Sequence, residues 1–309
     1  MMKAVMAALG SIRRVLGATL AAAGALLAGC SPLAALNGLG TDDGFARVVT
    51  ASYGSDPRQT LDVYVPRHPA NGKVVVFFYG GSWNSGSRAD YRFVAQTLTR
   101  HGATVVIADY RLYPEVVFPA FVEDAAAAVA WTFSHIAGHG GDPADISLVG
   151  HSAGAHLVAL LALDDRYLGA HGLRPGQLTR VVGLSTPADF ARTLGARWRP
   201  VFVDQATLDR AQPVRYANAD APPMLLLHGA DDTLVVPQNS LTLAERVRAA
   251  GGEAQVRVYP DTGHPATVLA FAPLLGNPAI LDDMLRFLEL DPAAAGSEAT
   301  MADTAAPQP

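Results

Sequence analysis

Short apolar runs alternate with amphipathic stretches along the middle of the chain. Residues 74–79 form a continuous apolar run, which is typical of a strand covered on both faces, and residues 104–108 and 146–149 predict two further buried strands. Residues 153–163 are almost wholly apolar over a helical length, which predicts a buried helix. The same alternation predicts further strands at residues 180–184, 224–227 and 255–259, and helices at residues 88–101, 119–134, 241–250 and 280–288. Buried strands that alternate with helices predict an α/β fold with a mostly parallel central sheet flanked by helices.

The segments around this alternation have different patterns. Residues 45–53 and 60–65 are separated by a turn sequence and predict two strands of a hairpin. Residues 186–222 are rich in Arg and Pro with weak periodicity, and we interpret them as a small inserted cap. Residues 291–309 are rich in Ala, Pro, Ser, Gln and acidic residues, which predicts a disordered tail. The folded domain is therefore expected over residues 45–290.

The first 29 residues have the pattern of an export signal. Lys3, Arg13 and Arg14 form a positive region without an acidic residue, and an apolar stretch follows over residues 15–28. This stretch is too short and too rich in small residues for a convincing membrane span. We therefore expect residues 1–29 to direct the protein out of the cytoplasm.

The only cysteine of the chain, Cys30, directly follows the apolar stretch, and a single cysteine excludes an internal disulfide. The sequence Leu-Ala-Gly-Cys at residues 27–30 resembles the lipobox of bacterial lipoproteins, in which the cysteine is diacylated and becomes the mature N-terminus. The resemblance implies a lipoprotein of the cell envelope, anchored at the outer membrane or the periplasmic face, with residues 30–44 as a tether. The alternative is an ordinary cleaved signal with a cysteine nearby by chance.

Composition excludes several other classes. The chain has 309 residues, of which 50% are hydrophobic and 17% charged, so it is long enough for a large core and too apolar to be disordered overall. Its formal net charge is −5 and no basic run occurs, which argues against a nucleic-acid partner. Nine histidines without clustered cysteines argue against a structural zinc site.

Residues 150–154 fit the pattern G-x-S-x-G, with Ser152 at its centre. The motif follows the expected strand at 146–149 and opens the expected helix at 153–163. A nucleophile elbow needs this strand–turn–helix context, because the tight turn exposes the serine hydroxyl above the sheet. The sequence therefore predicts that Ser152 is a nucleophile; the alternative is an idle serine in a glycine-rich turn.

Candidates for a base and an acid come later in the chain, as the elbow architecture requires. His264 follows the expected strand at 255–259 and is the only histidine after His228, so chain order predicts that it is the base. Two aspartates follow the strand at 224–227, and either Asp231 or Asp232 could be the acid. Both loops leave the carboxyl ends of strands, which is the edge where ligands bind in such sheets.

A third element of the predicted site is an oxyanion hole. The expected strand at 74–79 runs into Gly-Gly-Ser-Trp at residues 80–83. Backbone N–H groups can approach a substrate carbonyl there, and each donor aimed at an oxyanion can be worth about 3 kcal/mol. We expect the N–H groups of Gly81, Ser82 and Ala153 to be these donors.

Several ordered motifs together resemble the α/β-hydrolases of the carboxylesterase branch, in particular the hormone-sensitive-lipase-like, kynurenine-formamidase-like and feruloyl-esterase-like members. The resemblance covers about residues 45–290. The motifs that carry it are residues 79–83 (YGGSW), 109–112 (DYRL), 118–119 (FP), 123–124 (ED), 141–143 (GDP), 150–154 (GHSAG) and 228–232 (HGADD). One departure is Tyr79, because the branch usually has a histidine there that braces the oxyanion loop.

The resemblance implies the α/β-hydrolase fold and, from the H-G-x-x-D spacing, Asp232 as the acid. It implies a serine hydrolase that cleaves carboxylic esters, most simply short-chain ones, through an acyl-enzyme, with a small-molecule ester as substrate. Such a triad needs no metal and no organic cofactor. The alternatives are an arylformamidase or a peptidase of the same fold, or a non-catalytic envelope lipoprotein.

Four further side chains have open roles. We expect Trp198 and Phe202 to pack the cap onto the domain, although they could also line an acyl or alcohol pocket. His151 and His156 flank the predicted nucleophile. We expect His156 to pack within the helix at 153–163, while His151 could touch the site.

Overall fold

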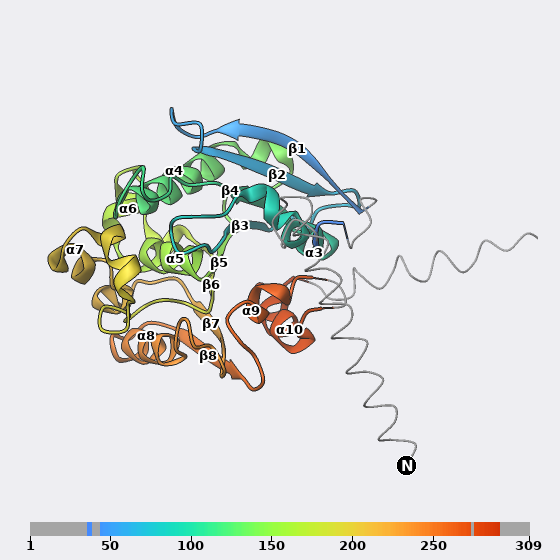
Figure 1. Cartoon of the computed structure of the whole chain (residues 1–309). Coiled ribbons are helices and arrows are strands. Elements are labelled where there is room, and N and C mark those ends of the chain that lie inside the picture. The colour runs from blue at the N-terminus through green and yellow to red at the C-terminus, as the bar shows by residue number, and fades with distance from the viewer. Residues whose placement is uncertain (1–35, 39–43, 273–274, 291–309) are drawn as a thin grey trace, which may run out of the picture.

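A computed structural model describes residues 36–38, 44–272 and 275–290, and an eight-stranded sheet runs through its centre (Figure 1). The strand order is β1-β2-β4-β3-β5-β6-β7-β8. β2 pairs antiparallel with both β1 and β4, and the pairs from β4 through β8 are parallel. The strands are β1 (Phe45–Ser52), β2 (Thr60–Pro66), β3 (Val74–Phe78), β4 (Thr104–Ala108), β5 (Ile146–His151), β6 (Val181–Leu184), β7 (Met224–Gly229) and β8 (Ala254–Tyr259). The prediction of an α/β fold with a mostly parallel sheet is confirmed.

Helices cover both faces of the sheet. Figure 1 shows α3 (Arg92–Arg100) and α10 (Pro278–Phe287) on one side, and α4 (Ala120–His135), α5 (Ala153–Leu163) and α8 (Gln238–Ala249) on the other. The strands β3 and β4 contain mostly Val, Ile and Phe, and every residue in them is buried. β-Branched and aromatic side chains favour strands, and coverage on both faces explains why these runs have no polar alternation.

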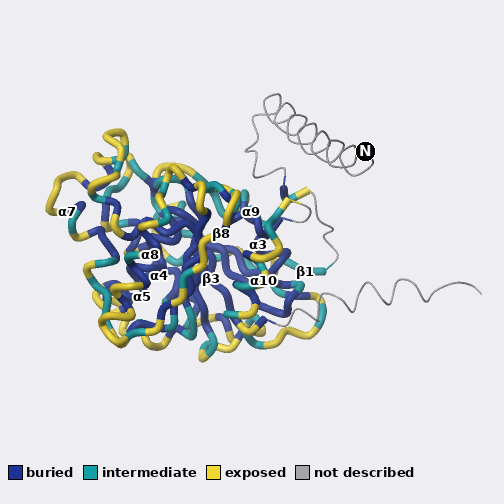
Figure 2. The backbone as a smooth tube through the Cα atoms, turned by 90° about the horizontal axis from the view of Figure 1, so that it is seen from below, coloured by how far each residue is buried: buried dark blue, intermediate teal, exposed yellow. Residues whose placement is uncertain are grey.

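The core follows the centre of the sheet and the helix that the nucleophile motif opens. All residues of α5 are buried, as its wholly apolar sequence predicts. Figure 2 shows the buried backbone running through the strands, with exposed residues concentrated in the loops and around α7 (Gln205–Arg210). Because α5 is buried along its whole length, the position of Ser152 at its N-terminus is fixed.

Element boundaries differ from the sequence expectation where polar or glycine residues begin or end an element. α8 begins at Gln238 rather than at residue 241, because its first turn is polar and its Asn239 and Ser240 are buried. β5 and β7 extend two residues beyond their apolar runs, to His151 and Gly229. These extensions carry the chain from the sheet directly into the loops of the candidate site.

We call residues 186–222 the cap segment; it lies between β6 and β7. It contains η5 (Ala196–Phe202), α7 and η6 (Pro213–Tyr216). The other short helices are η2 (Arg88–Tyr91), η3 (Ile136–His139), α6 (Asp165–Gly169), η4 (Pro175–Gln177) and α9 (Ala266–Leu269).

The predicted signal peptide over residues 1–29, most of the predicted tether over residues 30–44 and the predicted tail over residues 291–309 lie outside the described residues. Among the helices of the described ranges, none has the length and apolar character needed to cross a bilayer. The lipid anchor at Cys30 therefore stays a prediction from the sequence.

Candidate active site

Ser152 lies at the sharp turn between β5 and α5. Its φ of 53° and ψ of −119° place a non-glycine residue in a strained backbone conformation. The turn needs both flanking glycines, because a Cβ on Gly150 would collide with the carbonyl of Gly154, and one on Gly154 would collide with the carbonyl of Phe78. This is the backbone geometry of a nucleophile elbow.

The structure brings Ser152, His264 and Asp232 together. Ser152 Oγ lies 2.8 Å from His264 Nε2, and His264 Nδ1 lies 2.7 Å from Asp232 Oδ2. A carboxylate can only accept, so Nδ1 carries the proton that is donated to Asp232, and Nε2 is free to accept from the serine hydroxyl. Asp231 is exposed instead, and its backbone N–H donates to the carbonyl of Thr262.

The carboxylate of Asp232 is buried and heavily hydrogen-bonded. Its Oδ1 accepts from the N–H groups of Leu234 and Val235, at 3.0 and 2.9 Å, and its Oδ2 also lies 3.3 Å from His228 Nε2. Burial alone would raise the pKa of Asp232, but hydrogen bonds from His228, His264 and Val235 hold the pKa well below its usual range. The acid is therefore ionised at neutral pH and can stabilise a positive charge on His264.

The loop after β3 forms a tight turn next to the serine. Gly81, Ser82 and Trp83 have φ values of 133°, 52° and 59°, and a Cβ on Gly81 would collide with the carbonyl of Ser85. Among the described residues, the N–H groups of Gly81 and Ser82 have no hydrogen-bond acceptor. Ala153 is the first residue of α5, so its N–H has no acceptor within the helix. All three expected oxyanion donors are thus free to bind a substrate oxygen.

Tyr79 stands where the resemblance leads us to expect a histidine, and its hydroxyl ties β3 to the loop. Tyr79 Oη donates to Asp109 Oδ1 at 2.7 Å and accepts from Arg58 Nη2 at 2.9 Å. The same Arg58 nitrogen donates to the carbonyl of Gly86, and Asp109 also accepts from the backbone and side chain of Arg88. This network of buried and partly buried side chains braces both ends of the loop. The roles of Arg58 and Arg88 could not be predicted from the sequence, because nothing in the local pattern marks them.

His151 also contacts the site. It is buried, and its Nε2–H donates to the backbone carbonyl of His264 at 3.2 Å. Burial lowers the pKa of His151 to about 3, with a smaller effect from the neighbouring His264, so the ring is neutral at physiological pH. His151 therefore helps to place the backbone of His264 without adding a second positive charge beside it.

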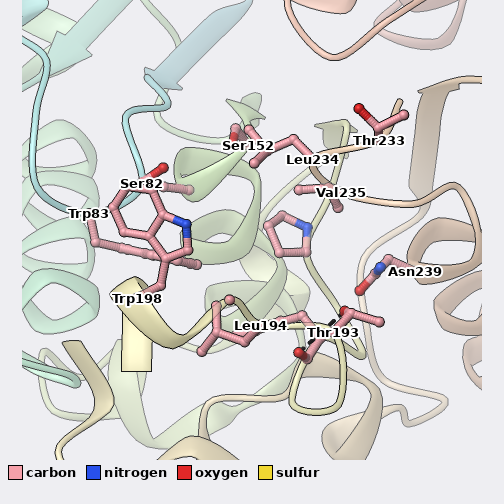
Figure 3. A pocket seen from close by; sticks show the side chains of 14 residues that line it. Ser82, Trp83, Ser152, Thr193, Leu194, Trp198, Thr233, Leu234, Val235 and Asn239 are labelled. Carbon is pink, nitrogen blue, oxygen red and sulfur yellow. Dashed lines mark hydrogen bonds between the residues drawn. The ribbon is translucent and has the colours of Figure 1, made fainter. Parts of the chain in front are cut away.

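A pocket of about 250 Å³ opens beside the serine, and Figure 3 shows the side chains around it. The cap segment contributes Trp198 to the lining, whereas Phe202 is buried behind the pocket among other aromatic rings. The expectation that both residues only pack the cap is therefore wrong for Trp198. The lining residues are Ser82, Trp83, Ser152, Ala153, Pro187, Phe190, Thr193, Leu194, Gly195, Trp198, Thr233, Leu234, Val235 and Asn239.

The arrangement has the parts that acyl transfer needs: a nucleophile, a base held by an ionised acid, and free N–H donors beside a pocket. Within residues 36–38, 44–272 and 275–290, no group of three or more His, Cys, Asp or Glu side chains could hold a metal ion.

The sheet, the elbow after β5 and the site at the carboxyl ends of the strands define an α/β-hydrolase. The chain belongs to the BD-FAE family, whose model matches residues 61–247.

Curated relatives of this chain are named as ester hydrolases. It is 28% identical over 281 residues to the probable isoprenylcysteine alpha-carbonyl methylesterase ICME of Oryza sativa, with 84% of this chain and 68% of the relative covered. It is 34% identical over 239 residues to esterase LipC of Mycobacterium tuberculosis, with 69% of this chain and 58% of that protein covered. A third relative is the probable carboxylic ester hydrolase LipM of the same organism. It is 31% identical over 248 residues, with 72% of this chain and 56% of LipM covered.

Solved structures show the same fold. A truncated carbohydrate esterase from gut microbiota matches with a TM-score of 0.70 at 21% identity, covering 81% of this chain and 97% of that one. An esterase of Thermogutta terrifontis matches with a TM-score of 0.65 at 24% identity, covering 78% and 91%. Family, relatives and fold together place the chain among the carboxylesterase-type hydrolases.

Proposed function

We propose that this protein is a serine hydrolase that cleaves short-chain carboxylic esters through an acyl-enzyme. The observation that carries the proposal is the chain of hydrogen bonds from Ser152 through His264 to Asp232, at 2.8 and 2.7 Å. This chain of hydrogen bonds favours a catalytic triad over a non-catalytic lipoprotein, because Ser152, His264 and Asp232 each bind the partner that the reaction needs.

In the proposed reaction, Ser152 Oγ attacks the ester carbonyl and His264 Nε2 takes its proton. The N–H groups of Gly81, Ser82 and Ala153 stabilise the oxyanion. The C–O bond to the alcohol then breaks, and the alcohol leaves with the proton from His264. Water attacks the acyl-enzyme in the same way, releasing the acid and restoring the serine, while the carboxylate of the triad stabilises the imidazolium in both steps.

The preference for short chains rests on the size of the pocket. Its volume of about 250 Å³ is below the roughly 300–1,000 Å³ of pockets that hold drug-sized ligands. Trp83, Phe190, Leu194 and Trp198 give it apolar walls, which suit a small hydrocarbon group. The substrate in this proposal is therefore a small-molecule ester with a short acyl chain.

We further propose that the enzyme works at the cell envelope, held to a membrane by lipid on Cys30. The support is the sequence of residues 1–30, with its positive start, short apolar stretch and lipobox-like end. Residues 30–44 then separate the lipid from the catalytic domain.

The test is a panel of p-nitrophenyl esters from acetate to octanoate, with the matching anilides, assayed on residues 31–309 and on its Ser152→Ala variant. Because a positioned nucleophile contributes several powers of ten to turnover, we expect Ser152→Ala to lose that much activity on the short esters. A fluorophosphonate should label the wild-type protein at Ser152.

The matched control is Ser134→Ala, which removes an exposed hydroxyl bonded only within α4 and should leave turnover and labelling unchanged. Ester turnover that survives Ser152→Ala would contradict the proposal. So would hydrolysis of the anilides in preference to every ester.

A further inference from the structure

His156 lies one turn after Ser152 in α5 and is fully buried. Both of its ring nitrogens are engaged: the indole N–H of Trp83 donates to His156 Nδ1 at 3.2 Å, and His156 Nε2–H donates to the carbonyl of Ala211 at 2.7 Å. A carbonyl and an indole N–H allow only this tautomer of a neutral ring. Burial lowers the pKa of His156 to about 4, so the ring stays neutral at physiological pH. One imidazole therefore joins the nucleophile helix, the oxyanion loop and the cap segment.

Trp83 separates the pocket from an aromatic cluster. It lines the pocket, while its ring packs against Phe121, Phe190 and Phe202, with centroid distances of 6.3, 5.8 and 5.1 Å. Of these three phenylalanines, only Phe190 also lines the pocket. A shift of the Trp83 ring would therefore open the pocket towards the cluster.

The segment that His156 holds in the cap also fixes the opposite wall. Gln212, next to Ala211, is buried, and its Oε1 accepts from the N–H groups of Phe190 and Ala191 at 2.7 and 3.1 Å. Its Nε2 donates to the carbonyl of Leu208 at 2.7 Å. The wall formed by Phe190 is thus attached to the same backbone that accepts the hydrogen bond from His156.

We propose that His156 is a positioning residue that sets the size limit of the pocket, by holding Trp83 on one side and the wall around Phe190 on the other. The proposal rests on the proposed ester hydrolysis and adds to it the feature that restricts the enzyme to short chains. A histidine that only filled space in the core would not affect the choice among substrates.

The test compares three variants. His156→Leu fills a similar space but removes both hydrogen bonds. His156→Gln keeps an acceptor for the indole and a donor for the carbonyl. Trp83→Phe removes the indole donor together with part of the ring that lines the pocket. The control is His171→Leu, the same change at an exposed turn. For each protein, kcat and KM are measured for p-nitrophenyl acetate, butyrate and octanoate, and the melting temperature checks folding.

We expect His156→Leu to raise the octanoate-to-acetate ratio of kcat/KM by about tenfold, mainly through a lower KM for octanoate, since one extra methylene in an apolar pocket can be worth that much. Trp83→Phe should shift the ratio in the same direction, and His156→Gln should restore it to within about threefold of the wild type. His171→Leu should leave it unchanged.

An unchanged ratio in His156→Leu, or a loss of equal size for all three esters, would overturn the inference. If His156→Leu does not fold, His156→Met, which also removes both hydrogen bonds, takes its place. A wild-type protein that cleaves none of the esters would refute the proposed function itself. A wild-type protein that cleaves them, with variants of unaltered chain-length preference, would refute only the role of His156.

Discussion

Two neighbouring aspartates differ in what surrounds them. Asp232 is buried and accepts hydrogen bonds from two backbone N–H groups and from His264, whereas Asp231 points into solvent. Only the carboxylate of Asp232 can accept the Nδ1–H of His264 and stabilise the imidazolium that forms during the reaction. The pKa of Asp232, held well below its usual range, keeps that carboxylate charged throughout the physiological range.

Asp232→Asn should therefore cut kcat by about 10⁴-fold, because an amide in place of the carboxylate favours the wrong tautomer of His264. Asp231→Asn is the matched control and should change kcat only slightly. Steady-state kinetics on p-nitrophenyl acetate measure both. The reverse ranking would move the acid to Asp231, and equal small effects would place it elsewhere.

At this scale the sequence was informative where a motif fixes the spacing. Ser152, His264 and the choice of Asp232 follow from G-x-S-x-G, chain order and H-G-x-x-D, and the structure brings these three residues together. His151 and His156 could not be assigned in the same way. His151 binds a carbonyl 113 residues away in the sequence, and His156 binds one 55 residues away. The local sequence does not encode such distant partners.

At the scale of elements, the loop after β3 depends on a buried polar network. Tyr79 donates to Asp109, Arg58 donates to Tyr79 and to the carbonyl of Gly86, and Arg88 donates to Asp109. These contacts hold the loop in the turn that leaves the oxyanion donors free. The network is therefore expected to act on turnover rather than on substrate binding.

Tyr79→Phe removes one hydroxyl from this network and keeps the ring. We expect kcat to fall by about tenfold with a smaller change in KM, because misplaced donors stabilise the transition state less well. Tyr167→Phe, in α6 away from the pocket, is the control and should leave both constants unchanged. A change in KM alone would show that the loop contributes to binding instead.

The strands and long helices could be predicted because burial imposes their apolar pattern, as in β3, β4 and α5. The start of α8 and the short helices of the cap segment could not. The first turn of α8 is polar because Asn239 binds the N–H groups of residues 188 and 189, so its sequence reflects a tertiary contact rather than a helical face.

At the scale of the whole molecule, two buried neutral histidines make stability depend on pH. Burial lowers the pKa of His151 to about 3 and that of His156 to about 4, from 6.5 in a solvated histidine. Below 6.5 the unfolded chain takes up protons that the folded protein resists, so the free energy of unfolding falls as pH falls towards the folded pKa values. Each histidine should lower the free energy of unfolding by roughly 2 kcal/mol between pH 7 and pH 5.

Urea unfolding at these two pH values checks the prediction. His156→Gln should lose part of the difference between pH 7 and pH 5, because the variant has one fewer buried group to protonate on unfolding. His171→Gln, which changes an exposed histidine, should keep the whole difference. The same difference in both variants would show that His156 does not contribute.

The N-terminal lipid is expected to decide where the molecule is held. If Cys30 carries the lipid, Cys30→Ala should release the protein from the membrane fraction. The change should be sharp, since a single acyl chain binds a membrane only marginally and the variant would lose two or three chains at once. Activity on soluble esters should survive, because Cys30 lies 122 positions before Ser152 in the sequence and belongs to no motif of the site. Mass spectrometry of the wild-type protein should find a lipid-modified Cys30 at the mature N-terminus. An unmodified N-terminus beyond Cys30 would instead make this a secreted enzyme without an anchor.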